Sequence, residues 1–348
     1  MVKGRPHEPA RRPAQLRAKH PEDAQRADGL RRRAPCKRPS SITSLTTPSR
    51  PPIASQPSTT QLPYYMKDIV YLNGQILPSS EAKLGVNDRG FIFGDGVYEV
   101  IATYEGQPFE MKRHMDRLRY SLGEISITGV DVDALGEKAL ELAAANNLEA
   151  APMGLVYMQI TRGCAPRTHA FPVGSVAPTV YMYAAPVNPK WDHAKGAAAI
   201  TLSDTRWSRC DIKTVSLLAN CMANQAAHEA GALEAIFLRD GMALEGTHTS
   251  MFVVVDGEVR TAPKTNYILP SITRELVLEI CAESGIPARE THIREGVLRS
   301  ADEIFLAGTT TEVLGIVTLD GKTVGTGKPG KTTQRLRQLY SERRLAAV

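Results

Sequence analysis

Arg209-Cys-Asp-Ile-Lys-Thr214 lies between a predicted strand and a predicted helix that begins near Val215. The amine of Lys213 in this loop can form a Schiff base with an aldehyde cofactor and then carry a proton. A lysine in a loop is usually a solvated surface residue. Lys213 therefore becomes a candidate only if the groups that hold such a cofactor occur elsewhere in the chain.

Four further regions supply groups of that kind. Glu245 follows a predicted hairpin, and a carboxylate beside a pyridine nitrogen keeps that nitrogen protonated. Pro270-Ser-Ile-Thr273 precedes a predicted helix whose first amides can bind an anion. Gly308-Thr-Thr-Thr311 follows a predicted strand and offers hydroxyls beside free amides, and Arg117 adds a fixed positive charge. Each signal alone is weak, because serine and threonine commonly cap helices.

Another candidate group occurs in Thr161-Arg-Gly-Cys-Ala-Pro-Arg-Thr-His-Ala-Phe-Pro172, where glycine and prolines indicate a loop. Arg167 and His169 lie two residues apart, a pairing that suits the binding of a carboxylate. The same composition also fits a solvated basic loop, so both interpretations stay open here.

The remaining pattern predicts an α+β fold, because strands joined by hairpins alternate with helices. Asn73-Gly74 suits a type I′ turn between strands at 69–72 and 75–77. A helix after Lys213 is predicted from an apolar stripe that ends before Gly231. Leu217, Leu218, Cys221, Met222 and Ala226 make up this stripe. Further strands are predicted at 97–104, 107–111, 175–185, 235–238, 242–244, 251–255, 259–261, 303–307 and 314–319, and further helices at 114–124, 131–147 and 272–283.

Charge and proline divide the chain. Residues 1–65 hold 13 Lys/Arg, 4 Asp/Glu and 11 of the 23 prolines, which predicts a disordered basic extension. Three interpretations stay open for it: an extension ahead of a natural start at Met66, a targeting peptide, or a nucleic-acid-binding tail. The body carries 29 Lys/Arg and 33 Asp/Glu, which argues against nucleic acid as its partner. Within the body, the proline-containing stretch 186–195 predicts a linker between domains at 66–187 and 188–348.

Cysteine usage and hydropathy narrow the class further. The 5 cysteines are odd in number and lack a repeated spacing, so neither a disulfide framework nor a metal site is predicted. Free thiols fit a reducing, cytoplasmic compartment. No apolar run approaches the roughly 20 residues that a membrane-spanning helix needs, so no membrane partner is predicted.

These stretches, taken in order, resemble the fold-type IV, or class IV, aminotransferases that depend on pyridoxal 5′-phosphate (PLP). The resemblance is strongest to the D-amino-acid (D-alanine) aminotransferases and covers about residues 67–340. Several matched blocks in a fixed order are far more specific than any single motif. The matching stretches are 88–100, 114–118, 161–163, 166–169, 206–207, 209–213, 234–237, 245–246, 271–274 and 309–310.

The resemblance implies a role for each candidate residue. Lys213 is expected to be the Schiff-base lysine and proton carrier, and Glu245 the partner of the pyridine nitrogen. The expected phosphate-binding residues are Arg117, Ile272, Thr273 and Thr309. The expected trap for the substrate carboxylate consists of Tyr98, Arg167 and His169. In this family the neighbouring subunit supplies the Arg/His loop, so a homodimer is implied. PLP is expected between a smaller N-terminal domain and a larger C-terminal domain.

Two departures from the family pattern bear on specificity. Thr247-His-Thr-Ser250 replaces a serine run that ends in asparagine, and Gly308 stands where a hydroxyl residue is common. The alternatives on the same fold are a branched-chain L-aminotransferase, an (R)-amine transaminase and an aminodeoxychorismate lyase. A donor amine without a carboxylate has no need of Arg167 and His169, which favours a D-amino acid donor with 2-oxoglutarate or pyruvate as acceptor. The intact Lys213 and Glu245 argue against a non-catalytic binding protein.

Overall fold

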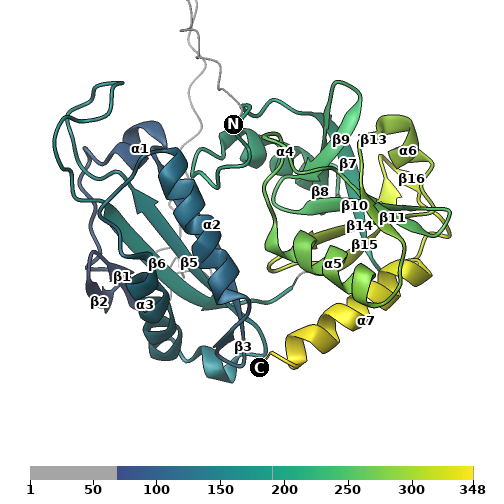
Figure 1. Ribbon diagram of the computed structural model, residues 1–348, viewed down its shortest axis with the longest axis horizontal. Coiled ribbons are helices and arrows are strands. Elements are labelled where there is room, and N and C mark those ends of the chain that lie inside the picture. Colours follow the sequence, from purple (N-terminus) through teal and green to yellow (C-terminus); the bar gives the residue numbers. More distant parts are fainter. Residues whose placement is uncertain (1–68, 190, 348) are drawn as a thin grey trace, which may run out of the picture. The chain divides into compact units, whose positions relative to one another are not determined.

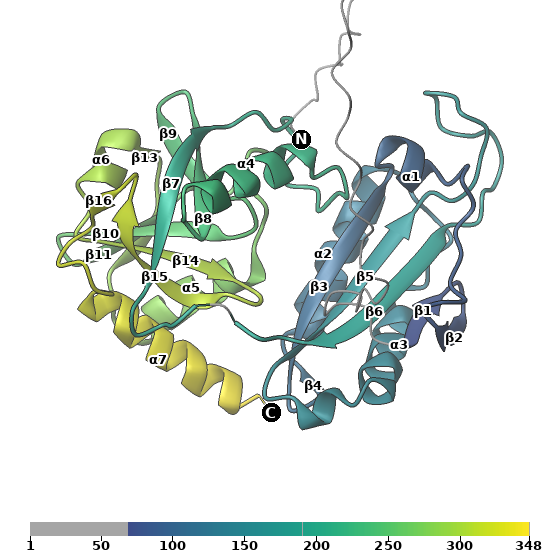
Figure 2. The same ribbon diagram turned by 180° about the vertical axis from the view of Figure 1, so that it is seen from behind.

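The computed structural model describes residues 69–189 and 191–347, shown in Figures 1 and 2. The predicted disordered extension at residues 1–65 lies outside the described residues. The described part contains two β-sheets with helices packed on them, so the predicted α+β class is confirmed. Within these ranges, no helix is long and apolar enough to cross a membrane.

Residues 69–186 form a six-stranded antiparallel sheet with the order β2-β1-β6-β5-β3-β4. Its strands are β1 Ile69–Leu72, β2 Gln75–Pro78, β3 Gly96–Tyr104, β4 Gln107–Pro108, β5 Gly154–Thr161 and β6 Thr179–Pro186. Asn73 and Gly74 have φ values of 47° and 95°. Positive φ at both central residues is what the predicted type I′ turn requires, and the hairpin is confirmed.

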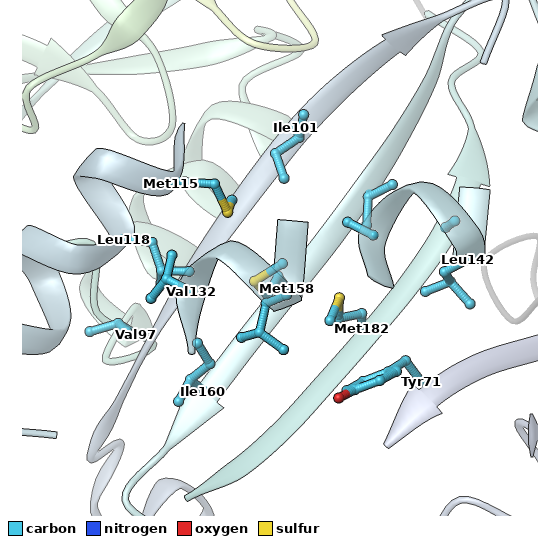
Figure 3. Close-up of a cluster of buried hydrophobic side chains, with 14 of the residues drawn as sticks. Tyr71, Val97, Ile101, Met115, Leu118, Val132, Leu142, Met158, Ile160 and Met182 are labelled. Atoms are coloured by element: carbon cyan, nitrogen blue, oxygen red, sulfur yellow. The ribbon is translucent and has the colours of Figure 1, made fainter. Parts of the chain in front are cut away.

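The helices of this region are α1 Arg89–Phe93, α2 Met111–Glu124, α3 Val132–Ala145 and the 3₁₀ helix η1 Leu148–Ala150. The side chain of Asp131 caps α3 by accepting a hydrogen bond from the amide of Ala134. Helices α2 and α3 pack on β3, β5 and β6 around the apolar core shown in Figure 3. Val97 and Ile101 point into this core, so the intervening Tyr98 faces the opposite side of β3.

Residues 197–323 form a ten-stranded sheet with the order β12-β11-β10-β14-β15-β7-β8-β9-β13, and β16 pairs with β15. An extra pairing of Glu245 with Ser250 joins β9 to β10 and closes the central strands into a ring. The strands are β7 Ala197–Ser203, β8 Glu234–Arg239, β9 Met242–Gly246, β10 Ser250–Val255, β11 Glu258–Thr261, β12 Ala288–Glu290, β13 Ile293–Arg294, β14 Glu303–Gly308, β15 Glu312–Leu319 and β16 Lys322–Thr323. The helices are α4 Leu218–Glu229, α5 Ile272–Glu283, α6 Glu295–Arg299 and α7 Lys331–Leu345. The proposed domain boundary after residue 187 falls between β6 and β7.

Two sequence predictions need correction. The strand predicted at 107–111 ends at Pro108, because Glu110 adopts a left-handed conformation from which α2 starts. The helix after Lys213 begins at Leu218 rather than near Val215. The apolar stripe from which this helix was predicted is exposed in part, since Leu218 and Met222 are 74% and 66% exposed. The buried residues of α4 are the small Ala223 and Ala227, which pack against Ala235 and Phe237 of β8. Strand β5 and helices α1 and α7 were not predicted.

Candidate active site

A cavity of about 370 Å³ lies between the six-stranded sheet and the ten-stranded sheet. Most of the predicted site residues meet there. Tyr98, Arg117, Lys213, Glu245 and Thr309 line it. Ile272 and Thr273 form the first turn of α5, next to the lining residue Ser271. Arg167 and His169 are exposed and are not among its lining residues.

Lys213 is held by its backbone rather than by its side chain. The amide of Tyr98 donates to the carbonyl of Lys213 over 2.9 Å, and the amide of Lys213 donates to Ser121 Oγ over 3.2 Å. The Nζ atom lies 4.2 Å from the ring centroid of Tyr98. Among the described residues, no carboxylate lies within salt-bridge distance of this amine. A half-buried amine without a counterion is available for covalent chemistry.

Glu245 closes β9 on another wall of the cavity. Its Oε1 accepts a hydrogen bond from Arg206 Nη1 over 2.5 Å, and its Oε2 accepts one from the amide of Leu269 over 3.1 Å. Burial raises the pKa of Glu245 to about 7, although the guanidinium of Arg206 pulls it down. Arg206 is fixed in turn by Asp204 and by stacking on the ring of Phe237. Sequence reasoning assigned Arg206 no role.

The first turn of α5 and the guanidinium of Arg117 meet at the end of the cavity. Ser271 caps α5 by accepting a hydrogen bond from the amide of Arg274. The first amides of a helix have no acceptor within the helix, so those that precede Arg274 can bind another group. Arg117 Nη1 donates to the carbonyl of Pro270 over 2.9 Å. This bond links α2 to the segment that leads into α5. Gly308 contributes no side chain here, and a Cβ at this position would lie 3.4 Å from Thr249.

Arg117 also belongs to a buried ion pair that the sequence did not reveal. Its Nε and Nη2 donate to the two oxygens of Glu99 over 2.7 and 2.9 Å, and His114 Nδ1 lies 2.8 Å from the same carboxylate. Glu99 is fully buried. Burial raises the pKa of Glu99, but the charge and hydrogen bonds of Arg117, together with the contact to His114, hold that pKa well below its ordinary value. The sequence signal that could have revealed this ion pair is Glu99 at a core-facing position of β3, together with the basic residues His114 and Arg117 on α2.

Residues 247–250, which line the cavity, are held by hydrogen bonds to a second buried carboxylate, that of Glu234. Its Oε1 accepts from the amide and hydroxyl of Thr247 over 3.0 and 2.5 Å, and its Oε2 accepts from the hydroxyl of Thr249 over 2.8 Å. His248 Nδ1 lies 3.2 Å from Oε2, with the imidazole half exposed on the cavity wall. His248, which departs from the family pattern, therefore lines the cavity and lies within hydrogen-bond distance of a buried carboxylate.

Comparison with known proteins assigns this geometry to a family. The family described as amino-transferase class IV matches residues 96–319. The chain is 40% identical to a D-alanine aminotransferase of Bacillus licheniformis, over 77% of this chain and 94% of that protein. This chain belongs to the class IV aminotransferases. The predicted family and the predicted transaminase activity are thereby confirmed.

Two solved structures show the same fold. The branched-chain amino acid aminotransferase of Escherichia coli superposes with a TM-score of 0.72 at 27% identity, over 78% of this chain and 92% of that one. A branched-chain amino acid aminotransferase of T.th., solved with pyridoxamine 5′-phosphate, superposes with a TM-score of 0.72 at 25% identity, over 80% of this chain and 95% of that one. The predicted fold-type IV architecture is confirmed.

Class IV aminotransferases depend on PLP, and the residues of this aminotransferase fit that cofactor. An aldehyde needs an amine that no carboxylate holds, which is Lys213. A ring nitrogen needs an acceptor, which Glu245 offers from a buried position. A phosphate needs unpaired amides, which the first turn of α5 presents. Lys213, Glu245 and Ser271, the N-cap of α5, all line one cavity.

Replacing Glu99 by glutamine in the aminotransferase tests the buried ion pair. We expect the unfolding free energy to fall by about 3 kcal/mol at pH 7, because the substitution leaves the buried charge of Arg117 unpaired. The folded-state pKa of Glu99 is depressed, so its contribution is present above the ordinary pKa near 4.5 and is lost as the pH falls below it. The difference between wild type and variant should therefore shrink in acid.

Urea unfolding of both proteins at several pH values measures that difference. Asp116→Asn is the matched control, because Asp116 lies on the same helix in an exposed pair with Lys112. We expect little change from it. Equal destabilisation by Glu99→Gln and Asp116→Asn would contradict the assignment of a buried, energetically important ion pair to Glu99.

Proposed function

We propose that this aminotransferase moves the amino group of a D-amino acid, such as D-alanine, to 2-oxoglutarate or pyruvate in a ping-pong cycle. One observation carries the proposal: the unpaired amine of Lys213, the buried carboxylate of Glu245 and Ser271, the N-cap of α5, line one cavity. The choice of a D donor is supported by the curated relatives, which are named D-alanine aminotransferases at 36–40% identity.

PLP, when bound, supplies an electron sink for the negative charge that develops at the α-carbon of the donor. The residues of the chain supply the rest. Lys213 would hold the cofactor covalently, and its Nζ, once displaced by the amine of the donor, would take up and return the proton of the α-carbon. Glu245 would accept a hydrogen bond from the ring nitrogen and favour its protonated form, and Arg206 fixes the direction of the Glu245 carboxylate.

The phosphate group is bound in this proposal by a charge and several polar groups around the first turn of α5. Arg117 supplies the guanidinium, and its direction is fixed by Glu99 and by the carbonyl of Pro270. Ile272 supplies a backbone amide, and Thr273 and Thr309 complete the set. Glu99 neutralises part of the charge of Arg117. The amides of the first turn of α5 therefore contribute more to phosphate binding than they would beside an unpaired arginine.

The carboxylate of the donor is bound in this proposal by Tyr98 together with Arg167 and His169. The last two do not line the cavity of their own chain, so the proposal includes a homodimer in which the neighbouring copy supplies them. Light scattering tests the dimer, which has two chains of 37.9 kDa.

A cytoplasmic location is also proposed. Cys164, Cys210, Cys221 and Cys281 are free thiols in the described part of the chain. Free thiols persist in reducing compartments. Cell fractionation with an antibody against the chain tests this location.

A branched-chain L-amino acid is the alternative donor, because the E. coli branched-chain enzyme shares the fold at 27% identity. The greater identity to a D-alanine enzyme, 40%, favours the D donor. Purified enzyme should be offered D-alanine and L-leucine, each with 2-oxoglutarate. We expect turnover of D-alanine, and turnover of L-leucine alone would overturn the D assignment.

Arg167→Ala tests the carboxylate trap in the same assay. We expect kcat/KM for D-alanine to fall at least about 30-fold, because truncating a charged hydrogen-bond partner costs about 2 kcal/mol or more. Cofactor binding, measured by absorbance, should not change. Arg119→Ala, which removes an exposed arginine of α2, is the control and should keep wild-type kinetics. If Arg167→Ala matches this control, the trap is assigned to the wrong residue.

A further inference from the structure

The loop that carries Arg167 and His169 has few contacts with the rest of the described chain. Between residues 166–174 and the other described residues, 69–189 and 191–347, one hydrogen bond is found. Arg89 Nη1 donates to the carbonyl of Thr168 over 2.7 Å. Thr168 lies between Arg167 and His169, so this bond fixes the backbone from which both side chains project.

Aromatic contacts hold the same loop on either side of that bond. The guanidinium of Arg167 lies 5.2 Å from the ring centroid of Phe93 in α1, and the ring of His169 lies 5.8 Å from it. Further along, the guanidinium of Arg162 lies 3.6 Å from the ring centroid of Phe171. Cations are attracted to the faces of such rings. Arg89 and Arg162 therefore contact the loop at two separate places.

A single carboxylate fixes both arginines. Arg89 Nε donates to Asp95 Oδ2 over 2.7 Å. Arg162 donates to both oxygens of Asp95, with Nε to Oδ2 at 2.8 Å and Nη2 to Oδ1 at 2.9 Å. The three side chains are at most 9% exposed. Arg162 also donates to the carbonyls of Ile125 and Ser126, which anchors the group to the end of α2. Planar guanidinium groups paired in this way have little rotational freedom.

We propose that Asp95, Arg89 and Arg162 form a positioning unit, the loop clamp, that holds Arg167 and His169 in the conformation that binds the carboxylate of the donor. The inference rests on the proposed function of those two residues. The clamp touches neither Lys213 nor Glu245, so it acts on the affinity for the donor and not on proton transfer. When only a fraction of molecules is competent to bind, the apparent affinity falls by that fraction.

Asp95→Asn tests the clamp in the holoenzyme. We expect the KM for D-alanine to rise about tenfold, which corresponds to a loop that holds the carboxylate-binding conformation in about one tenth of the molecules. The kcat should stay within about twofold of wild type, and the affinity for PLP should not change. Deuterium exchange at the amides of residues 167–173 should become about tenfold faster. A fall in kcat and PLP affinity without faster exchange would indicate a general structural role and overturn the proposal.

A second pair of variants keeps the test decisive if Asp95→Asn does not fold. Phe171→Ala removes a ring that is 53% exposed and contacts Arg162, so we expect a higher KM and faster exchange with an unchanged melting temperature. Val173→Ala is the control, because Val173 is fully exposed on the same loop. The clamp is overturned if Phe171→Ala gives the same KM and exchange as Val173→Ala.

The two readouts separate this inference from the proposed function. If Arg167→Ala leaves the KM for D-alanine unchanged, the carboxylate trap is wrong, and the exchange rates alone then decide whether the clamp holds the loop. If Arg167→Ala raises the KM and Asp95→Asn changes neither the KM nor the exchange, the trap stands and the clamp is overturned.

Discussion

Lys213→Ala is expected to reduce transamination of D-alanine at least about 1,000-fold. The substitution removes the covalent attachment of the cofactor and the group that carries the α-proton, and proton transfer by a positioned side chain alone accounts for about 10²–10⁴-fold. Steady-state assays with 2-oxoglutarate measure the loss. Because the described residues offer Nζ no ion-pair partner, the melting temperature of the cofactor-free protein should stay at the wild-type value.

Reduction with borohydride locates the attachment independently of turnover. In the wild type we expect the reduced adduct on the peptide that contains Lys213, and in Lys213→Ala we expect none. Lys195→Ala is the matched control, because Lys195 is an exposed lysine in the segment between β6 and β7 and should leave both rate and adduct unchanged. Recovery of the adduct on a different lysine would refute the assignment of Lys213.

Glu245→Gln is expected to lower kcat about 100-fold or more. An amide cannot hold the proton on the ring nitrogen as a carboxylate does, so the charge that develops at the α-carbon is stabilised less. Glu245→Asp, which keeps the charge, should recover part of the rate. Single-turnover absorbance with D-alanine measures the proton-transfer step. Equal rates for Glu245→Gln and wild type would show that this carboxylate is not the partner of the ring nitrogen.

The same substitution has a second consequence in the cofactor-free protein. Burial raises the pKa of Glu245 from 4.5 to about 7, so the folded chain binds this proton more tightly than the unfolded chain does. The contribution of Glu245 to stability is therefore present below pH 4.5 and is lost as the pH rises to about 7. Glu245→Gln should remove that part of the pH dependence, which urea unfolding across this range measures.

Much of the local structure could be predicted from short stretches. Asn73-Gly74 adopts the turn that its residues favour, Asp131 caps α3, and α5 runs from Ile272 to Glu283 as its pattern predicts. These features depend on neighbours a few residues apart, where backbone propensity and capping hydrogen bonds decide the conformation. The order of the motifs around Lys213 and Glu245 also indicated the family correctly.

Contacts between segments that are far apart along the chain could not be predicted from these short stretches. The apolar stripe predicted the helix α4 but did not show which face is buried. The face that packs on β8 is formed by the small Ala223 and Ala227. Strand β5 was missed, although it pairs with residues 96–103 of β3 in the middle of the six-stranded sheet. Amphipathic patterns show that a helix has faces, and only packing shows which one is covered.

The sequence by itself determined many of the elements, the family and the residues most suited to hold PLP, because backbone propensities and the order of motifs depend on short stretches of sequence. Only the tertiary structure brought Lys213, which has no counterion among the described residues, to the same cavity as a buried Glu245, and paired Arg117 with Glu99. It alone set Asp95 between Arg89 and Arg162 beneath the loop of Arg167. These groups are far apart along the chain, and their charges and burial exist only once the sheets and helices bring them together.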